Sequence, residues 1–450
     1  MVPQLCGLVT GNPHPRRTGQ HRDFGVLWLS DVASQFGTAV HFVAIPLIAA
    51  TVLEAGPVEM GLLTAAGTAA NLLIGLPAGA WADRMRRLPV MRYAEAGQAL
   101  LLASVPIAWW AGALTYPHLL AVSLLCGAMF TLFEVASQSY LPSLVARVDL
   151  PEANRRLHTS RQVMHFSGRP AGGALAQLLG ATNALVASVF GFVASLLLLG
   201  RMNRERPAVA VQPRGRLTEE IGEGLRFLFA HWLLRPTTLF SMIHNFFLNV
   251  YVAVNVLFLV RDLQLAEGSV GLLLSVTGAG GILGGLTTRF WSNSFGTVRA
   301  LIVVTVLTTP FRLLVPFADR GWALSLFVVG VFVGGYGTVV FAVLQVSLRQ
   351  SVCPDRLLGR VNASTRFLTW GVIPLGALAG GALGALLGIR AAIMIAAVGM
   401  TLACCLLFVA PLRHLREAPE ELLSAEADLT RIVGDEPDRD RHDEPDTSAR

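Results

Sequence analysis

Lysine is absent from the 450-residue chain, and all 35 basic side chains are arginine. Together with 44 glycines and many alanines and leucines, this bias is typical of a GC-rich genome. Charged residues of both signs amount to only 14%, against about 25% in an ordinary globular protein. This low charge content excludes a disordered chain and most soluble enzymes, and the 53% of hydrophobic residues indicates a membrane protein.

Cysteine is also scarce, and its five copies form no pattern that binds a metal or builds a disulfide framework. The count is odd and three of the five lie within apolar runs, so we expect reduced packing residues. The sequence shows no nucleophile elbow, phosphate loop or ATP-binding domain, which disfavours an enzyme and ATP-driven transport by this chain alone. We expect no metal or cofactor. The net charge of +6 comes without a basic, aromatic-rich patch, so nucleic acid is not an expected partner.

Long hydrophobic runs are what the chain has in abundance, and each is long enough for a helix that spans the roughly 20 residues of a bilayer core. We predict an all-α membrane protein with twelve transmembrane helices. The first run is too long for a signal peptide and is expected to be retained. The predicted spans are 24–53, 58–82, 90–112, 118–141, 161–181, 184–201, 236–260, 268–291, 298–318, 321–348, 364–388 and 390–411.

The loops between these runs predict the orientation, because arginines favour the cytoplasmic side. The N-terminal arm and the even-numbered loops hold most of the loop arginines, so both termini should be cytoplasmic. The predicted organisation is an arm (1–23), a six-helix half (24–201), a linker (202–235), a second six-helix half (236–411) and an acidic disordered tail (412–450). Residues 216–231 of the linker read as an amphipathic surface helix.

An internal repeat supports two halves in parallel orientation. GGALAQLLG at 172–180 and GGALGALLG at 380–388 match at seven of nine positions, about 208 residues apart. Two further matches occur at offsets of about 204 and about 205 residues. A single match of this kind can arise by chance from the composition, but three matches at nearly the same offset indicate duplication of a six-helix unit.

The loop after the second run makes the assignment more specific. Residues 79–87 (GAWADRMRR) resemble the loop motif G-x-L-A-D-R-x-G-R-[RK] of the major facilitator superfamily, whose plan is two parallel six-helix halves. The resemblance implies a gating loop in which a carboxylate latch holds one side closed. Arg86 and Leu88 depart from the motif, which leaves the geometry of the latch open. The residues that carry the motif are Gly79, Asp83, Arg84 and Arg87.

Further stretches are similar to one subgroup, the bacterial drug:proton antiporters of the macrolide-efflux and enterobactin-exporter-like branch. The similarity covers about residues 22–416 and is weak for substrate, because that branch handles diverse cargo. The stretches are LWLSDVASQFG (27–37), QSYLPSLV (138–145), EGLRFLF (223–229), LFLVRDL (257–263) and residues 346–371.

Two carboxylates lie deep in the predicted spans, at roughly 10 Å from the nearer membrane surface. Asp31 is in the first span and Glu134 in the fourth, and the resemblance implies that both spans line a central cavity. Since burial favours the neutral form of a carboxylate, we nominate both residues for proton coupling. A structural ion pair, or a position near the water interface, is the alternative for each. Glu95 is only a few residues into the third span and is read as interfacial.

The fifth span carries Arg161, His165 and Arg169 along one helical face. The antiporters' motif G-P-x-x-G-G here reads GRPAGG (168–173), so the position of the usual kink is in doubt. Arg169 either neutralises Glu134 as a structural pair or moves between Glu134 and an anionic group of the substrate. Arg161 is read as interfacial, and His165 and Arg169 as cavity residues.

Asn245 and Asn249 share a face of the seventh span. They either bind substrate or join neighbouring helices by hydrogen bonds. The spans of the second half contain no carboxylate, so any proton handling should lie in the first half.

These observations predict an exporter of amphipathic small molecules, such as an antibiotic, secondary metabolite or siderophore, driven by proton antiport through alternating access. An uptake symporter or facilitator of the same fold is one alternative, and a transport-inactive membrane sensor or scaffold is another. We expect a monomeric, multi-pass protein of the bacterial cytoplasmic membrane. Its partners would be the small-molecule substrate, protons and the lipid bilayer.

Overall fold

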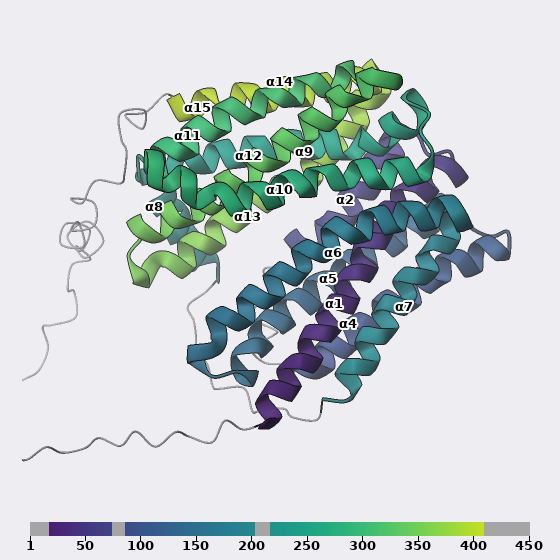
Figure 1. Ribbon diagram of the computed structural model, residues 1–450, viewed down its shortest axis with the longest axis horizontal. Coiled ribbons are helices and arrows are strands. Elements are labelled where there is room, and N and C mark those ends of the chain that lie inside the picture. The colour runs from purple at the N-terminus through teal and green to yellow at the C-terminus, as the bar shows by residue number, and fades with distance from the viewer. Residues whose placement is uncertain (1–17, 74–85, 203–216, 409–450) are drawn as a thin grey trace, which may run out of the picture.

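Helices make up nearly all of the computed structural model, which describes residues 18–73, 86–202 and 217–408 (Figure 1). Those ranges contain no β-strand. Within them, nine helices are long and apolar enough to cross a membrane. The all-α prediction is therefore confirmed for the part of the chain that the structure describes.

The nine helices coincide with nine of the predicted spans. The remaining three predicted spans fall on α2, α4 and α6. The described part of α2 has only 17 residues, and the predicted span runs on beyond it. Helices α4 and α6 carry polar and ionisable side chains, among them Glu95, Arg161 and Arg169. The count of twelve spans therefore stays a prediction.

The N-terminal helices pack against one another and form what we call the first helix group (Figure 1). Its members are α1 (Thr18–Leu47), α2 (Pro57–Leu73), α4 (Arg87–Trp110), α5 (Tyr116–Leu144), α6 (Leu150–Leu179) and α7 (Ala181–Gly200). Helix α7 ends where Arg92 of α4 donates hydrogen bonds to the carbonyl oxygens of Leu199 and Met202, at 2.8 and 2.7 Å. A guanidinium at this place satisfies carbonyls that have no partner within the helix.

The C-terminal helices form the second helix group. Its members are α9 (Leu234–Leu257), α10 (Glu267–Phe295), α11 (Thr297–Thr308) with a 3₁₀ extension to Phe317, α12 (Leu324–Val352), α13 (Asp355–Leu387), α14 (Ile389–Ala403) and α15 (Cys405–Phe408). Helix α8 (Leu217–Ala230) falls within the stretch for which the sequence predicts a surface helix. It packs on α13 through an ion pair between Glu223 and Arg360. The end of the molecule at which α8 lies is called the α8 end below.

The two groups meet near the end opposite α8, called the closed end, at two pairs of glycines. A methyl group on Gly173 of α6 would come within 2.6 Å of the Gly271 Cα on α10. One on Gly61 of α2 would come within 2.8 Å of the Gly381 Cα on α13. Glycine at all four positions thus allows the helix backbones to touch. Toward the α8 end the two groups diverge (Figure 1).

The groups also repeat unusual local structure, in agreement with the internal repeat of the sequence. Helices α1 and α9 both end in one turn of π-helix, followed by Glu54 and Gln264 in the left-handed region at φ of 50° and 48°. The two repeated nonapeptides end at Gly180 and Gly388, with φ of 84° and 91°. Each of these glycines alone joins one long helix to the next, a conformation that other residues rarely adopt.

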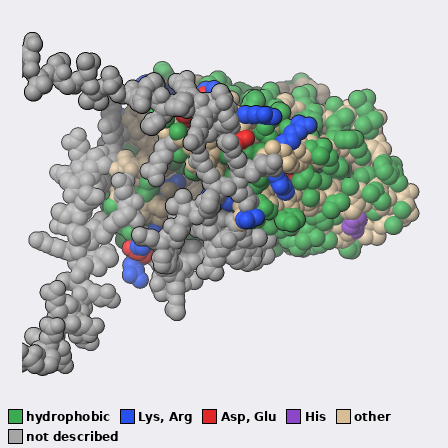
Figure 2. All heavy atoms as spheres, turned by 90° about the horizontal axis from the view of Figure 1, so that it is seen from below, with side chains coloured by type: hydrophobic (Ala, Val, Ile, Leu, Met, Phe, Trp, Pro, Cys, Tyr) green, Lys and Arg blue, Asp and Glu red, His purple; other side chains and the backbone are tan. Residues whose placement is uncertain are grey.

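The surface of the helices is strongly apolar. Large hydrophobic side chains stand exposed on both groups, including Leu100, Phe190, Leu286 and Leu386. Figure 2 shows one face, on which hydrophobic side chains cover the part away from α8 while arginines gather toward the α8 end. An apolar surface of this extent fits a lipid environment.

Candidate functional site

A buried ion-pair cluster lies inside the first helix group, where Arg161 of α6 joins two carboxylates. Its guanidinium donates to Asp31 of α1 through Nη2 at 2.8 Å and Nε at 3.0 Å, and to Glu134 of α5 through Nη1 at 2.8 Å. Asp31 has no exposed surface, and the Arg161 side chain is 14% exposed. The interpretation of Arg161 as an interfacial residue is therefore wrong: it is the counter-ion of both nominated carboxylates.

The cluster is short of one positive charge. If both carboxylates are ionised, one guanidinium balances only one of them, and the set carries a net charge of −1. Gln138, one turn along α5, donates its amide to Glu134 Oε1 at 2.7 Å and holds that carboxylate without neutralising it. Two carboxylates that share one cation in a poorly solvated place favour the binding of one proton. The structure brings Asp31 and Glu134 together as the sequence alone did not indicate.

Arg169 lies two turns further along α6 and reaches the other helix group. Its Nη1 donates to the carbonyl oxygen of Leu274 on α10 at 3.2 Å, and its guanidinium lies 5.4 Å from the centre of the Phe42 ring. Because Glu134 is bound by Arg161, the interpretation of Arg169 as the structural partner of Glu134 is wrong. His165 lies half-buried between the two arginines along α6, and its role as a cavity residue stays a prediction.

Glu95 is a functional candidate that sequence reasoning missed. It is fully buried on α4, and neither carboxylate oxygen has a hydrogen-bond partner within the described residues. Its neighbours Ser34 and Ser195 project from α1 and α7. No ion pair to Glu95 is found among the described residues, and burial favours the neutral form of such a carboxylate, so Glu95 is a further candidate for proton binding. Full burial against α7 and beside Ser34 of α1 is not what a position at the water interface predicts.

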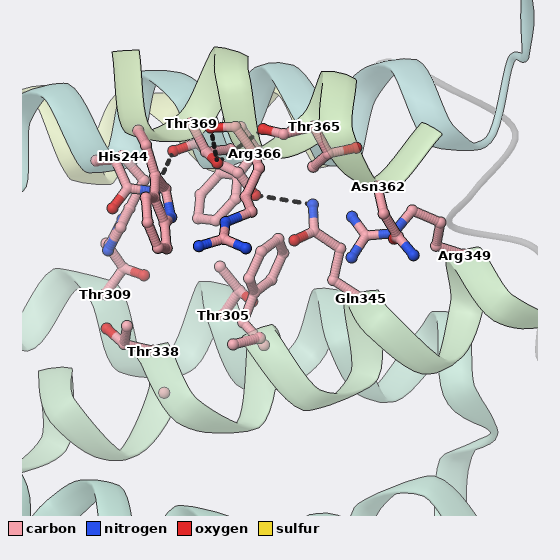
Figure 3. Close-up of a pocket in the computed structure, with 17 residues that line it drawn as sticks. His244, Thr305, Thr309, Thr338, Gln345, Arg349, Asn362, Thr365, Arg366 and Thr369 are labelled. Atoms are coloured by element: carbon pink, nitrogen blue, oxygen red, sulfur yellow. Dashed lines mark hydrogen bonds between the residues drawn. The ribbon is translucent and has the colours of Figure 1, made fainter. Parts of the chain in front are cut away.

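A cavity of about 390 Å³ lies within the second helix group (Figure 3). Helices α9, α12 and α13 and the junction of α11 with its 3₁₀ extension form its walls. Most of the lining residues have polar side chains: Ser241, His244, Asn245, Thr305, Thr309, Thr338, Gln345, Arg349, Asn362, Thr365, Arg366 and Thr369. Phe240, Phe341 and Trp370 add aromatic surface. A volume of this order suits a drug-sized ligand.

The two predicted asparagines differ in their relation to the cavity. Asn245 lines it and donates its amide to the Ser241 carbonyl of its own helix at 2.9 Å, which leaves the amide oxygen available. Asn249 is not a lining residue, and its amide donates to the Asn245 carbonyl at 2.8 Å. Here both amide nitrogens bond within α9. The link to a neighbouring helix comes instead from Gln345 of α12, which donates to Ser241 Oγ at 2.8 Å (Figure 3).

Most of the predicted gating loop lies outside the described residues, namely Gly79, Asp83 and Arg84. Arg87, the last residue of that set, is the first residue of α4. Its Nε is buried without a hydrogen-bond partner among the described residues. The latch itself therefore stays a prediction.

Ionisable groups near the α8 end, outside the spans, have shifted pKa values, among them Glu152 and His231. Hydrogen bonds from Arg155 and Arg156 to the exposed Glu152 lower the pKa of that carboxyl to about 2. Burial lowers the pKa of His231, which follows α8, below its ordinary value. The neutral His231 ring accepts the backbone N–H of Leu233 at Nδ1, at 3.3 Å.

The chain is similar in sequence to known exporters. The family model described as transmembrane secretion effector matches residues 19–431. The multidrug efflux pump Tap of Mycolicibacterium fortuitum is 25% identical over 384 residues, which are 81% of this chain and 90% of the pump. The enterobactin exporter EntS of Escherichia coli strain K12 is 25% identical over 421 residues, 90% of this chain and 96% of the exporter.

Solved transporter structures share the fold. The nucleoside transporter NupG gives a TM-score of 0.69 at 14% identity, covering 86% of this chain and 99% of that one. A bacterial homologue of the iron transporter ferroportin gives 0.67 in its inward-facing state at 15% identity, covering 86% and 98% of the two chains. The same homologue gives only 0.55 in its outward-facing state. The helix arrangement is therefore more similar to the inward-facing form.

Proposed function

Because the chain belongs to the transmembrane secretion effector family of the major facilitator superfamily, we propose that it is a secondary active exporter of amphipathic small molecules, driven by proton antiport. Membership of this family of transporters and the nine apolar helices make it a multi-pass transporter of the bacterial cell membrane. The direction of transport is proposed from the two relatives, whose names are those of efflux proteins.

The observation that carries proton coupling is the cluster of Asp31, Arg161 and Glu134. Two carboxylates share a single guanidinium at distances of 2.8 Å, with Asp31 fully buried. Protonation of one carboxylate leaves a neutral ion pair, so the cluster accepts and releases a proton without isolating a buried charge. Glu95 adds a third buried carboxylate in the same helix group. We therefore place proton exchange in the first helix group.

In this proposal, transport proceeds by rocking of two six-helix halves that are related as parallel repeats. The glycine contacts between the two helix groups support the repeat. Gly61 of the first half corresponds to Gly271 of the second, and Gly173 corresponds to Gly381, at offsets of about 210 residues. Gly61 packs against Gly381 and Gly271 against Gly173, so the same contact occurs twice, once in each direction between the halves. The higher TM-score with the inward-facing transporter supports assigning the α8 end, where α1 begins and α15 ends, to the cytoplasm.

The proposed path for substrate runs between the groups, with the cavity of the second group as the binding pocket. Asn245 belongs to its lining. His165 and Arg169 of α6 do not line this cavity and are proposed as further contacts along the path. Asp83 and Arg84 are proposed to act as the latch of the gating loop, and Asp83→Asn should then slow transport and leave equilibrium binding intact.

Proteoliposomes with an imposed pH gradient test the antiport. Dye accumulation is followed for the xanthene dyes fluorescein and rhodamine 123, with and without the gradient, in the wild type, Asp31→Asn and Glu134→Gln. Asp149→Asn, which removes an exposed carboxylate between α5 and α6, is the matched control. We expect the two cluster variants to lose gradient-driven accumulation and to keep downhill exchange. Full gradient-driven transport by both variants would show that the antiport mechanism is wrong.

A further inference from the structure

The spans predicted from the sequence for the second helix group contain arginines but no acidic residue. Aspartate and glutamate are absent from the sequence between Glu267 and Asp319, between Asp319 and Asp355, and from there to Glu417. Within the same stretches lie Arg312, Arg349 and Arg366, one on each of the three elements that line the cavity besides α9. No ion pair is found for these three arginines among the described residues.

Two of these arginines point into the cavity. Figure 3 shows Arg366 extending from α13 toward the middle of the space, with Arg349 of α12 beside Asn362. The Arg366 guanidinium lies 4.2 Å from the centre of the Trp370 ring, one turn along the same helix. Nε of Arg349 is buried without a hydrogen-bond partner within the described residues.

The third arginine, Arg312, does not line the cavity but lies close enough to the lining residue His244 to interact with it electrostatically. Arg312 is 3% exposed, and its Nε also has no partner within the described residues. Its guanidinium lies 6.0 Å from the centre of the Tyr251 ring and close to the backbone of Gly334. A buried guanidinium nitrogen without a partner is unfavourable, and an anion brought into the cavity offsets that cost for Arg349 and Arg312, while the exposed side chain of Arg366 meets the anion directly.

We propose that this cavity binds an organic anion, an amphipathic acid with a carboxylate or a comparable oxyanion. The planar guanidinium of Arg366 matches such a group with two parallel hydrogen bonds, and Arg349 is the second donor on the side of the α8 end. Phe240, Phe341 and Trp370 form the aromatic wall for the apolar body of the ligand. That this anion is the transported cargo rests on the proposed exporter function; the binding site itself does not.

In this proposal the two helix groups have different roles, which follow from the sign of their buried charges. The first group holds carboxylates that exchange protons, and the second holds guanidiniums that bind the anion. Outward movement of an anion is also favoured by a membrane potential that is negative inside. Cargo of this charge would therefore leave the cell with help from both components of the proton-motive force.

Equilibrium binding of dyes in nanodiscs of phosphatidylcholine tests the site without any gradient. Fluorescence anisotropy measures the Kd of anionic fluorescein and of cationic rhodamine 123, which share one ring system. We expect wild-type protein to bind fluorescein at least about tenfold more tightly than rhodamine 123, a ratio that corresponds to 1.4 kcal/mol. Arg366→Gln should remove this preference, Arg366→Lys should restore part of it, and Arg349→Gln should weaken fluorescein binding several-fold.

The control variant is Arg289→Gln, which removes an exposed arginine of α10 that does not line the cavity. Thermal unfolding of each variant shows whether it is folded. Equal affinity for both dyes, absent fluorescein binding, or fluorescein binding unchanged in folded Arg366→Gln would overturn the proposal. Competition by phosphatidylglycerol that disappears in Arg366→Gln would assign the anion to a lipid headgroup and overturn its identity as cargo.

The outcome is separable from that of the antiport experiment. One outcome is binding that prefers the anionic dye and depends on Arg366, together with transport that does not respond to a pH gradient. That outcome supports the anion site and contradicts only the proposed proton coupling. The opposite outcome is gradient-driven transport of rhodamine 123 without binding of fluorescein. It supports the proposed antiport and contradicts only the anion site.

Discussion

Replacing Arg161 by glutamine should be among the most destabilising single changes in the first helix group. The substitution removes the guanidinium that holds Asp31 and Glu134 and leaves two carboxylates close together. Asp31 is fully buried and the Glu134 side chain is 18% exposed, so water replaces little of the lost interaction. The variant must then take up at least one proton, which the two carboxylates can share, or separate helices α1, α5 and α6.

The magnitude follows from the contacts. Removing one member of a buried ion pair costs roughly 3–5 kcal/mol, because the remaining charge is left without a partner. Arg161→Gln leaves both carboxylates in this position and should reach that range. Glu134→Gln is different, since Arg161 keeps its two bonds to Asp31 and a neutral amide can still accept a hydrogen bond. For that variant we expect a loss of about 1 kcal/mol, typical of one weakened hydrogen bond.

Unfolding by sodium dodecyl sulfate in mixed micelles, followed by circular dichroism, measures both variants and the wild type at pH 7.5. Arg155→Gln is the control, because it removes an arginine whose ion pair with Glu152 is exposed, and no measurable change is expected. A triple change of Arg161, Asp31 and Glu134 to the neutral amides should recover most of the loss. Equal stability of Arg161→Gln and wild type, or a larger loss in Glu134→Gln, would refute the charge balance assigned to the cluster.

Three further changes test other features. Gly173→Val should separate α6 from α10 at Gly271 and shift the protein away from this conformation, measured as a longer distance between spin labels on the two helices. Glu95→Gln should leave stability unchanged, because a neutral amide replaces a neutral acid, yet lower gradient-driven transport; a marked loss of stability would show that Glu95 is ionised. His231→Gln should flatten the acid sensitivity of unfolding. The pKa of native His231 lies below the ordinary 6.5, so the unfolded chain binds the proton first and native stability declines as the pH falls below about 6.5. A wild-type profile without that decline would contradict the burial of the ring.

Composition was enough to predict the helical membrane architecture. Repeated apolar runs of about 20 residues, in a chain with so few charged residues, are stable as helices that span a bilayer. The same reasoning found the carboxylates Asp31 and Glu134, since ionisable groups stand out within apolar runs. It misjudged Arg161 because depth was counted along the sequence. Helix α6 begins at Leu150, so Arg161 is three turns inside the helix and faces α1 and α5.

The cavity was the least predictable part of the site. Its lining comes from four elements spread between Phe240 and Trp370, and each contributes threonine, serine or asparagine, which are ordinary residues of membrane helices. Sequence spacing gives the face of one helix but not which faces of separate helices converge. The one usable signal was the absence of aspartate and glutamate from the predicted spans of the second half, which indicates that Arg366 has no acidic partner within those spans.

The glycine contacts at the closed end have a mechanical consequence. The molecule is narrow where Gly61 meets Gly381 and Gly173 meets Gly271, and wider at the α8 end (Figure 1). It therefore occupies different cross-sectional areas in the two leaflets of a bilayer. Every change between conformations must do work against the lateral pressure of the lipids on each side. The two groups are joined there by the glycine contacts and by the hydrogen bond from Arg169 to the Leu274 carbonyl oxygen. The shape of the surrounding lipids should therefore change the transport rate without changing the affinity of the cavity for its ligand.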